Sequence, residues 1–378
     1  MTRVVTPAFW RGARVFLTGH TGFKGAWLSL VLRRLGAEVT GYALPPDEAS
    51  LYTAAAVDDG LTSTLADIRD LERLTSALRA ARPTVVFHLA AQALVRAGYH
   101  DPVGTYATNV MGTVHLLEAV RQVPGVRAVV VVTSDKCYDD SEGSRREGSW
   151  GYREIDPMGG HDPYSSSKGC AELATAAYAR SFFAPERHGE HGVGIASARA
   201  GNVIGGGDWA ADRLVPDLIR GLESGSPVAI RNPEACRPWQ HVLEPLAGYL
   251  MLAERLSTAR PEEFSGWNFG PGPDAEQPVR RVAERLCALW GNPAGWRATP
   301  DPGAPREAHL LRLDITKARS RLGWSPRWSL EQALAATVDW YRERHGGDAR
   351  GLTERQIDAY FGAARCSAGL GGPDEAEG

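Results

Sequence analysis

Residues 15–25 read VFLTGHTGFKG: an apolar run leads straight into glycines at positions 19, 22 and 25, and a helical pattern follows over 25–35. Glycines at this spacing between a strand and a helix typically hold a dinucleotide. The first permits a tight turn, the second admits a pyrophosphate close to the backbone, and the third lets helix and strand pack closely. The positive end of the helix then faces the phosphates. We therefore expect a dinucleotide-binding loop made of Gly19, Thr21, Gly22, Phe23, Lys24 and Gly25.

Short apolar runs alternate with helical patterns from Arg14 to about Val203. The expected strands are 15–18, 38–43, 84–89, 128–133 and 194–198, and the expected helices are 25–35, 71–81, 103–120 and 165–182. Strands that alternate with helices form a parallel sheet covered on both faces. The fold class predicted is therefore α/β, with a Rossmann-type doubly wound parallel sheet. In this context nucleotide binding explains the glycine turn better than packing alone does.

The texture of the sequence changes after Gly205, where prolines and glycines become frequent and strand-like runs become shorter. We expect residues 11–204 to form the dinucleotide-binding Rossmann domain, with returning segments near 238–272. Residues 205–345 are expected to form a smaller, interleaved C-terminal substrate-binding lobe. Residues 362–378 are rich in glycine, alanine and acidic side chains, which predicts a disordered tail.

Bulk composition argues against several classes of protein. A net charge of −3, from 42 basic and 45 acidic residues, gives no sign of a surface for nucleic acid or an anionic membrane. No apolar segment approaches the length of a membrane span, about 18 residues. Five cysteines without a Cys-x-x-Cys pair indicate free thiols in a reducing compartment. We expect a cytoplasmic protein without a metal site, since His188 and His191 lie in a polar loop and are poor candidate ligands.

The second strand does not identify the dinucleotide. An acidic residue about 20 positions after the glycines would bind a ribose 2′-hydroxyl, but no acid follows this strand before Asp47. No arginine that would bind a 2′-phosphate lies there either, so NAD and NADP both stay open. Further along, Asp67 and Ile68 follow a short strand pattern and are candidates for the cofactor. Asp67 can contact an adenine amine, or it can lie in a solvated turn before a helix capped by Asp70.

A tyrosine and a lysine lie at the start of the expected helix 165–182. Tyr164 and Lys168 are four residues apart, so they share one face of the helix. A tyrosine of ordinary pKa, about 10, is a poor base at neutral pH, whereas a nearby ammonium stabilises the phenolate and lowers this pKa. The alternative is a surface Tyr–Lys pair, which the preceding dinucleotide loop disfavours. We predict that Tyr164 and Lys168 act together as catalytic base and acid.

The expected strand 128–133 delivers a second polar group to the carboxyl edge of the sheet, where ligands bind in open α/β folds. This group is Ser134, Asp135 and Lys136. Ser134 can hydrogen-bond a substrate hydroxyl beside Tyr164, and Asp135 with Lys136 can form an acid/base pair. The alternative is a solvated polar turn, which the neighbouring strand end disfavours.

Several motifs together resemble the extended short-chain dehydrogenase/reductase superfamily, over about residues 14–341. They are the glycine loop, the run HLAA at 88–91, Asn109, a Ser/Thr on the fifth strand, and the Tyr164–Lys168 pair. Narrower runs resemble the CDP-glucose 4,6-dehydratases: residues 19–27, 133–138, 162–172, 199–209 and 237–242. Related dTDP-glucose dehydratases carry Asp-Glu where this chain has Asp135-Lys136, and simple 4-epimerases lack this pair.

The resemblance implies a nucleotide-sugar dehydratase with an internal hydride cycle on NAD. Tyr164, with Lys168 and Ser134, would take the proton of the sugar 4-hydroxyl while NAD takes the C4 hydride. Asp135 would protonate the departing 6-hydroxyl, and Lys136 stands at the position of the C5 base. Because a free lysine has a pKa of about 10.4, Lys136 is a base only if that pKa is lowered. Otherwise it stabilises an enolate while water or Asp135 moves protons.

The resemblance also implies binding residues outside the glycine loop. It assigns Leu89, Ala90 and Ala91 to the cofactor, and Gln92, Arg96, Asn202, Arg237, His241 and Arg306 to the nucleotide-sugar substrate. It further implies a homodimer built through helices 103–120 and 165–182. Two alternatives stay open. One is a nucleotide-sugar 4-epimerase or reductase on the same fold, and the other is a non-catalytic dinucleotide sensor, which would be expected to lack the Tyr164–Lys168 pair.

Overall fold

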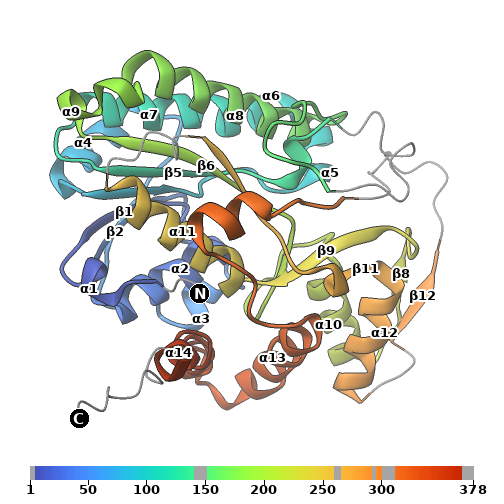
Figure 1. Cartoon of the computed structure of the whole chain (residues 1–378). Helices are drawn as coiled ribbons and strands as arrows, with labels where there is room; N and C mark the ends of the chain where they lie inside the picture. Colours follow the sequence, from blue (N-terminus) through green and yellow to red (C-terminus); the bar gives the residue numbers. More distant parts are fainter. Residues whose placement is uncertain (1–4, 140–150, 259–264, 292–294, 300–310, 368–378) are drawn as a thin grey trace, which may run out of the picture.

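The computed structural model describes residues 5–139, 151–258, 265–291, 295–299 and 311–367, and its largest element is a seven-stranded sheet (Figure 1). The strands are β1 Arg14–Thr18, β2 Glu38–Ala43, β3 Thr62–Leu65, β4 Val85–His88, β5 Ala128–Val132, β6 Gly194–Ala200 and β10 Gly266–Phe269. Their order is β10-β6-β5-β4-β1-β2-β3, and all neighbours are parallel. The predicted doubly wound sheet is confirmed, and the order reverses between β1 and β4, where such folds bind ligands.

Successive residues of a strand point to opposite faces of the sheet. Both faces of this sheet are therefore apolar, and helices cover each of them. On β1, Val15 and Leu17 belong to one apolar core and Phe16 to the other. The helices α2 Phe23–Arg34 and α11 Leu243–Leu256 cover the first face. The second face is covered by α4 Leu71–Ala81, α7 Gly112–Gln122 and α8 Pro163–Phe182 (Figure 1).

A smaller lobe contains two short sheets and three helices. One sheet is formed by β7 Asn202–Ile204, β9 Cys236–His241 and β11 Glu276–Pro278, and the other by β8 Val228–Ile230 with β12 Trp296–Ala298. Beside them lie α10 Leu214–Ser224, α12 Val279–Trp290 and α13 Leu330–Glu343 (Figure 1). Between β9 and β11 the chain returns to the large sheet as α11 and β10, so the two lobes interleave in sequence.

The expected single helix over 103–120 is interrupted, and this prediction is wrong in detail. The structure has α6 Pro102–Tyr106, a π-helical turn Ala107–Met111, and then α7. In the turn, the Asn109 side chain accepts from the backbone N–H of Gln92 at 2.8 Å and donates to the hydroxyl of Ser167 at 2.9 Å. Such turns often occur at functional sites, and this one ties the loop after β4 to α8.

A long helix, α14 Ala349–Ser367, follows the smaller lobe and packs near α2. Asp358 of α14 accepts two hydrogen bonds from the Arg34 guanidinium, at 2.8 and 2.7 Å. The predicted tail therefore does not begin at Gly362, because the helix continues to Ser367. Residues 368–378 lie outside the described residues.

The remaining α-helices of the described residues are short: α1 Pro7–Trp10, α3 Leu51–Ala54, α5 Val95–His100 and α9 His188–His191. Within the described ranges, no helix combines the length and the apolar character needed to cross a bilayer.

Candidate active site

The glycine loop between β1 and α2 has the backbone geometry that its spacing predicts. Gly19 has φ +76°, in the region that favours glycine, and a Cβ there would lie 2.6 Å from the backbone nitrogen of Ala90. A Cβ on Gly25 would lie 2.0 Å from the carbonyl oxygen of Gly19. Gly22, by contrast, is exposed at the start of α2, and a Cβ there would meet only the Gly19 carbonyl, at 3.4 Å. The loop thus leaves bare backbone open at a helix N-terminus, which fits a pyrophosphate.

The residues that follow β4 border this loop. Thr18 Oγ1 accepts from the backbone N–H groups of Leu89 and Ala90, each at 3.2 Å. The ends of β1 and β4 are therefore joined, and the segment that contains Ala91 leaves the sheet beside the glycines.

Two further loop residues contact other parts of the chain. Thr21 is buried and donates to the carbonyl oxygen of Leu44 at 3.0 Å, which ties the loop to the end of β2. The Phe23 ring faces the smaller lobe, since a Cβ on Gly205 would lie 3.4 Å from its Cζ.

Lys24 lies in the electrostatic field of the catalytic candidates as well as in the loop. Burial lowers the pKa of its amine to about 8; the charges of Arg213 and Lys168 add to this effect, and those of Asp135 and Asp208 oppose it. The loop motif predicts a cofactor contact for Lys24 but not this second environment, because spacing alone does not say where a long side chain ends.

The predicted adenine contact, Asp67, lies in a tight turn after β3. Its carboxylate accepts from the backbone N–H of Arg69 at 2.9 Å and pairs with the Arg69 guanidinium at 2.6 Å, which lowers the pKa of Asp67. Asp70 caps α4 by accepting from the backbone N–H of Arg73 at 3.0 Å, and Ile68 is buried. The turn-and-cap interpretation is therefore confirmed, and an adenine contact stays a prediction.

Tyr164 and Lys168 lie one turn apart at the start of α8 and are 8% and 6% exposed. Asp162 caps this helix by accepting from the backbone N–H of Ser165 at 2.9 Å. Ser134 acts on the Tyr164 phenol and lowers its pKa against the effect of burial. The structure thus brings α8 and the turn after β5 together at the carboxyl edge of the sheet.

The protonation of this pair differs from the sequence expectation. Burial raises the pKa of Tyr164 to about 12, and the hydrogen bond with Ser134 opposes this only in part. The expected lowering of the Tyr164 pKa is therefore wrong, because desolvation of the phenolate outweighs the favourable contacts. Burial also lowers the pKa of Lys168 to about 8, against the charge of Glu172. Both shifts favour neutral side chains.

Ser134, Asp135 and Lys136 lie at a 3₁₀ turn, Asp135–Cys137. The Ser134 hydroxyl accepts from the backbone N–H of Lys136 at 3.3 Å and donates to Oδ1 of Asp135 at 3.0 Å. Asp135 is 3% exposed, and its Oδ2 has no hydrogen-bond partner among the described residues. Burial raises the pKa of Asp135, while the charge of Lys136 and the Ser134 hydrogen bond oppose the shift. A buried carboxyl that favours its neutral form is suited to donate a proton.

Two predicted sugar-binding residues are already paired with protein. The Gln92 amide donates to the Thr105 hydroxyl at 2.9 Å and accepts from the backbone N–H of Leu94 at 2.5 Å. Arg96 forms an ion pair with Asp212 at 3.0 Å. Either residue would have to exchange a protein partner to bind a ligand.

Two candidates from the smaller lobe remain near the site. Arg237 on β9 is 5% exposed, and its charge lowers the pKa of Asp135 against the effect of burial. Its guanidinium donates to the carbonyl oxygen of Cys236 at 2.8 Å. Asn202 is half-buried on β7, directly opposite Trp239 of β9.

The last two candidates are His241 and Arg306. His241 is fully buried, with its ring 4.7 Å from that of Trp328 and edge-to-face against Trp27. Burial lowers the pKa of His241 to about 3, so it is a neutral core residue, which corrects its assignment to the substrate. Arg306 lies outside the described residues.

Two charged residues near the catalytic pair, Arg213 and Glu172, are not among the residues predicted from the sequence. Arg213 pairs with Asp208 at 2.8 Å, and its charge lowers the pKa of Tyr164 against burial. Glu172 is buried on α8, eight residues after Tyr164. Asp208 and Glu172 lie within the motif runs, but their partners are distant in sequence, so no local pattern reveals these pairs.

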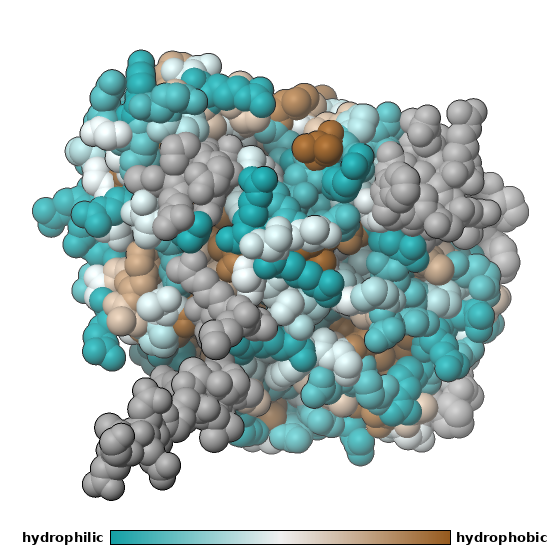
Figure 2. Space-filling view, in the orientation of Figure 1, coloured by the Kyte–Doolittle hydropathy of each residue, from teal (hydrophilic) through white to brown (hydrophobic). Residues whose placement is uncertain are grey.

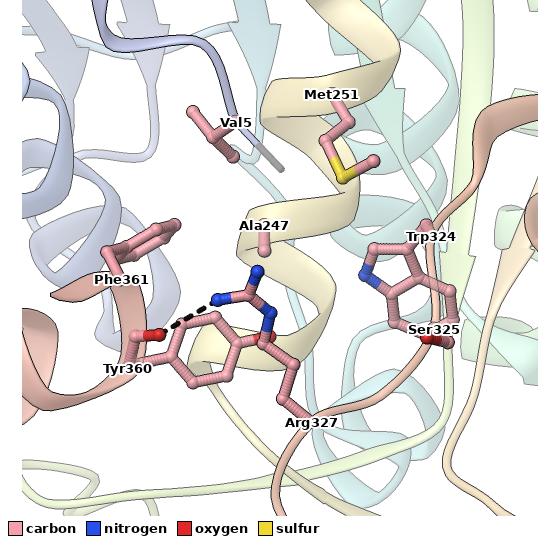
Figure 3. A pocket seen from close by; sticks show the side chains of 8 residues that line it. All are labelled: Val5, Ala247, Met251, Trp324, Ser325, Arg327, Tyr360 and Phe361. Atoms are coloured by element: carbon pink, nitrogen blue, oxygen red, sulfur yellow. Dashed lines mark hydrogen bonds between the residues drawn. The ribbon is translucent and has the colours of Figure 1, made fainter. Parts of the chain in front are cut away.

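A small pocket lies away from these residues, between α11, α14 and the segment 324–327. Figure 3 shows its lining and the hydrogen bond, 2.9 Å long, from the Arg327 guanidinium to the carbonyl oxygen of Tyr360. It is lined by Val5, Ala247, Met251, Trp324, Ser325, Arg327, Tyr360 and Phe361. None of the predicted site residues lines it. Among the described residues, no group of three or more His, Cys, Asp or Glu side chains could hold a metal ion.

Similarity to known proteins agrees with this geometry. Residues 15–265 match the family described as the NAD dependent epimerase/dehydratase family. A CDP-glucose 4,6-dehydratase of Salmonella typhimurium is 52% identical to this chain over 362 residues, which cover 95% of this chain and 99% of that relative. A dTDP-glucose 4,6-dehydratase of Streptomyces antibioticus is 31% identical, over 76% of this chain and 78% of that relative.

A solved structure has the same fold. The dTDP-glucose 4,6-dehydratase of Streptomyces venezuelae, with NAD and TYD bound, superimposes with a TM-score of 0.72 at 26% identity. The match covers 88% of this chain and 98% of that structure. This chain belongs to the NAD dependent epimerase/dehydratase family.

Proposed function

We propose that this chain converts CDP-D-glucose to CDP-4-keto-6-deoxy-D-glucose, with loss of water, by an internal hydride shuttle on NAD. The CDP-glucose 4,6-dehydratase that is 52% identical over 95% of this chain supports the substrate. The observation that carries the reaction type is the row of Tyr164, Ser134 and Asp135, in which Ser134 lowers the pKa of Tyr164 and donates a hydrogen bond to Oδ1 of Asp135. This row joins a redox-type phenol to a buried acid, and a dehydration needs that second acid whereas a simple 4-epimerisation does not.

The proposed NAD site consists of the glycine loop, Asp67, Ile68, residues 89–91, Tyr164 and Lys168. The close backbone contacts at Gly19 and Gly25 and the open backbone at Gly22 support it. Bound there, NAD would supply the hydride acceptor for C4 of the sugar and, once reduced, the hydride donor for C6.

In the first half of the reaction, Tyr164 takes the proton of the sugar 4-hydroxyl. Burial opposes the phenolate, but the hydrogen bond with Ser134 and the charge of Arg213 favour it. Lys168 lies one turn along, and with its pKa lowered to about 8 it can pass a proton onward near neutral pH. Ser134 orients the sugar hydroxyl beside the phenol.

In the second half, Asp135 supplies the proton that the departing 6-hydroxyl needs. The ketone at C4 acidifies the C5 hydrogen; a base removes that proton, the C6–O bond breaks, and water leaves. Once a hydride has been added at C6, the protonated base returns a proton to C5, which gives the 4-keto-6-deoxy sugar. The raised pKa of Asp135 supports this role, because this carboxyl holds a proton to a higher pH than an ordinary aspartic acid does. Lys136 is proposed at C5, either as the base or as the charge that stabilises the enolate.

The proposed substrate contacts lie on both lobes. Asn202 and Arg237 are placed to bind the nucleotide pyrophosphate, and Gln92 and Arg96 lie on the sugar side. Arg306 keeps the same proposed role outside the described residues. Residues 205–345 would then form most of the substrate-binding lobe, and residues 11–204 the cofactor domain.

We also propose a cytoplasmic homodimer that forms through the layer of α6, α7 and α8. Apolar side chains on this layer are exposed, among them Val103 at 79%, Met111 at 46% and Leu173 at 62%. Figure 2 shows apolar surface (brown) at the top of the view, over this helix layer. Exposed apolar groups on neighbouring helices typically mark an interaction surface. Sedimentation of the purified chain as a monomer would contradict the dimer.

The substrate is tested by incubating the purified chain with CDP-, dTDP-, UDP- and GDP-glucose in separate reactions. A 4-keto-6-deoxy sugar absorbs in strong alkali and a 4-epimer does not, so the same assay separates a dehydratase from an epimerase. We expect the absorbing product from CDP-glucose. Its absence from that reaction would overturn the proposed substrate.

A further inference from the structure

A buried ion pair lies directly behind the catalytic row. Glu172 and Arg199 are 5% and 3% exposed, and a guanidinium nitrogen of Arg199 lies 2.8 Å from Oε2 of Glu172. The Glu172 carboxylate also accepts from the hydroxyls of Thr133 and Ser197, the latter at 2.5 Å. A buried pair of this kind recovers its desolvation cost only when such additional hydrogen bonds are present.

The position of Glu172 links the two elements that carry the proton-transfer groups. It lies one turn after Lys168 on α8, on the same face. Its partner Thr133 immediately precedes Ser134, at the end of β5. A single carboxylate therefore joins the catalytic helix to Thr133, the residue before the Ser134–Lys136 turn.

Arg199 holds the other end of the same turn. Its guanidinium donates to the Tyr138 hydroxyl at 2.6 Å and lies 5.0 Å above the Tyr138 ring. Tyr138 directly follows the 3₁₀ turn Asp135–Cys137 and donates in its turn to Oδ1 of Asn268 at 2.7 Å. The ion pair thus reaches Thr133, just before Ser134, and Tyr138, just after Cys137.

Glu172 also acts on Lys168 through its charge. Burial lowers the pKa of Lys168, and Glu172 is the first of the charges that oppose this effect. A pair of apolar side chains could fill the same space, often without loss of stability. It could neither hydrogen-bond Thr133 and Tyr138 nor provide this charge.

We infer that the Glu172–Arg199 ion pair is a positioning device for the reaction. It holds the Ser134–Lys136 turn against α8, so that Tyr164, Lys168 and Asp135 keep the relative placement that their successive proton transfers need. Neither residue contacts the substrate in this role. The inference rests on the proposed function, because it concerns the two proton-transfer steps of that reaction.

The first test is Thr133→Val, which removes one hydroxyl that binds Glu172 and keeps the shape of the side chain. A displacement of about 1 Å in reacting groups can lower a rate by about 100-fold, so we expect kcat to fall by about 10- to 100-fold. The KM for the nucleotide sugar and the affinity for NAD should stay close to those of the unaltered chain. Thr133→Ser, which restores the hydroxyl, should restore kcat.

The matched control is Thr175→Val. Thr175 is also a buried threonine, 4% exposed, but its hydroxyl donates at 2.7 Å to the carbonyl oxygen of Ala171 within α8. Its replacement should leave kcat unchanged. Equal kcat values for Thr133→Val and the unaltered chain would overturn the inference, as would an equal loss of kcat in Thr175→Val. Absence of any turnover in the unaltered chain would instead overturn the proposed function itself.

Discussion

The catalytic helix and the catalytic turn each contain a buried carboxylate, Glu172 on α8 and Asp135 in the turn after β5, and the two differ in their partners. Asp135 and Glu172 are 3% and 5% exposed. Burial raises the pKa of Asp135, which has a hydrogen bond on Oδ1 and no partner on Oδ2 among the described residues. Burial would raise the pKa of Glu172 as well, but its ion pair with Arg199 and its hydroxyl partners lower it overall.

This difference shows that burial alone does not decide whether a carboxyl reacts. A fully partnered carboxylate holds its neighbours in place, since each partner would lose a hydrogen bond if it moved. A carboxyl with an unused oxygen favours its proton and has an oxygen free for a ligand. The structure thus distinguishes Glu172, which holds its neighbours in place, from Asp135, which can react. Amino-acid composition alone does not distinguish two such acidic residues.

The largest effect on kcat is expected at Tyr164, whose phenol lies in one row with Ser134 and Asp135. Tyr164→Phe removes the proposed base, so kcat should fall by about 10⁴-fold, the upper range for general acid–base catalysis. The NAD affinity, measured by fluorescence titration, should be nearly unchanged, because the glycine loop is intact. Unchanged turnover in this variant would refute the assignment of Tyr164 as the base.

The partnered carboxylate should dominate stability. Glu172→Gln leaves the Arg199 charge buried without its counterion, so the free energy of unfolding should fall by about 3–5 kcal/mol. Urea denaturation at pH 7 measures this change. Replacing both Glu172 and Arg199 by methionine should recover most of the stability but not the turnover. Full stability in Glu172→Gln would remove the distinction between the two carboxylates.

The unpartnered carboxylate should show the opposite behaviour. Asp135→Asn removes the proposed acid, so kcat should fall by about 100-fold or more. Because it also removes the cost of a buried charge, the free energy of unfolding at pH 7 should rise, by about 0.5–2 kcal/mol. A variant that loses both activity and stability would show that Asp135 is a structural residue.

The smallest effect concerns pH. The changes in the free energy of unfolding of Glu172→Gln and of Asp135→Asn should both depend on it. The folded-state pKa of Glu172 is lowered, so its stabilisation is present above the unfolded pKa of 4.5 and is lost as pH falls below it. The folded-state pKa of Asp135 is raised above 3.8, so its cost is present at neutral pH and disappears as pH falls toward 3.8. Denaturation at pH 7 and at about pH 4 should therefore show the deficit of Glu172→Gln and the gain of Asp135→Asn both shrinking. A gain in Asp135→Asn that grows at low pH would contradict the raised pKa.

Much of the fold could be predicted because its signals are local. The apolar runs predict β1, β2, β4, β5 and β6, and the start of α8 follows from Asp162 and Pro163 as cap and first-turn residue. The sequence also predicts the turn with Asp67 and the cap by Asp70, as one of two interpretations of this segment, the other being an adenine contact. These features depend on residues within a few positions of one another.

The sequence by itself determined which chemical groups reach the carboxyl edge of the sheet. The glycine loop, the Ser134–Lys136 turn and the Tyr164–Lys168 pair each follow a strand or begin a helix, so their place in the fold comes from local pattern. The tertiary structure alone decided the state of those groups. Burial raises the pKa of Tyr164, encloses His241, and brings Glu172 to Arg199 and Thr133. The physical reason is that desolvation and pairing depend on contacts between residues far apart in the chain, which no short-range periodicity encodes.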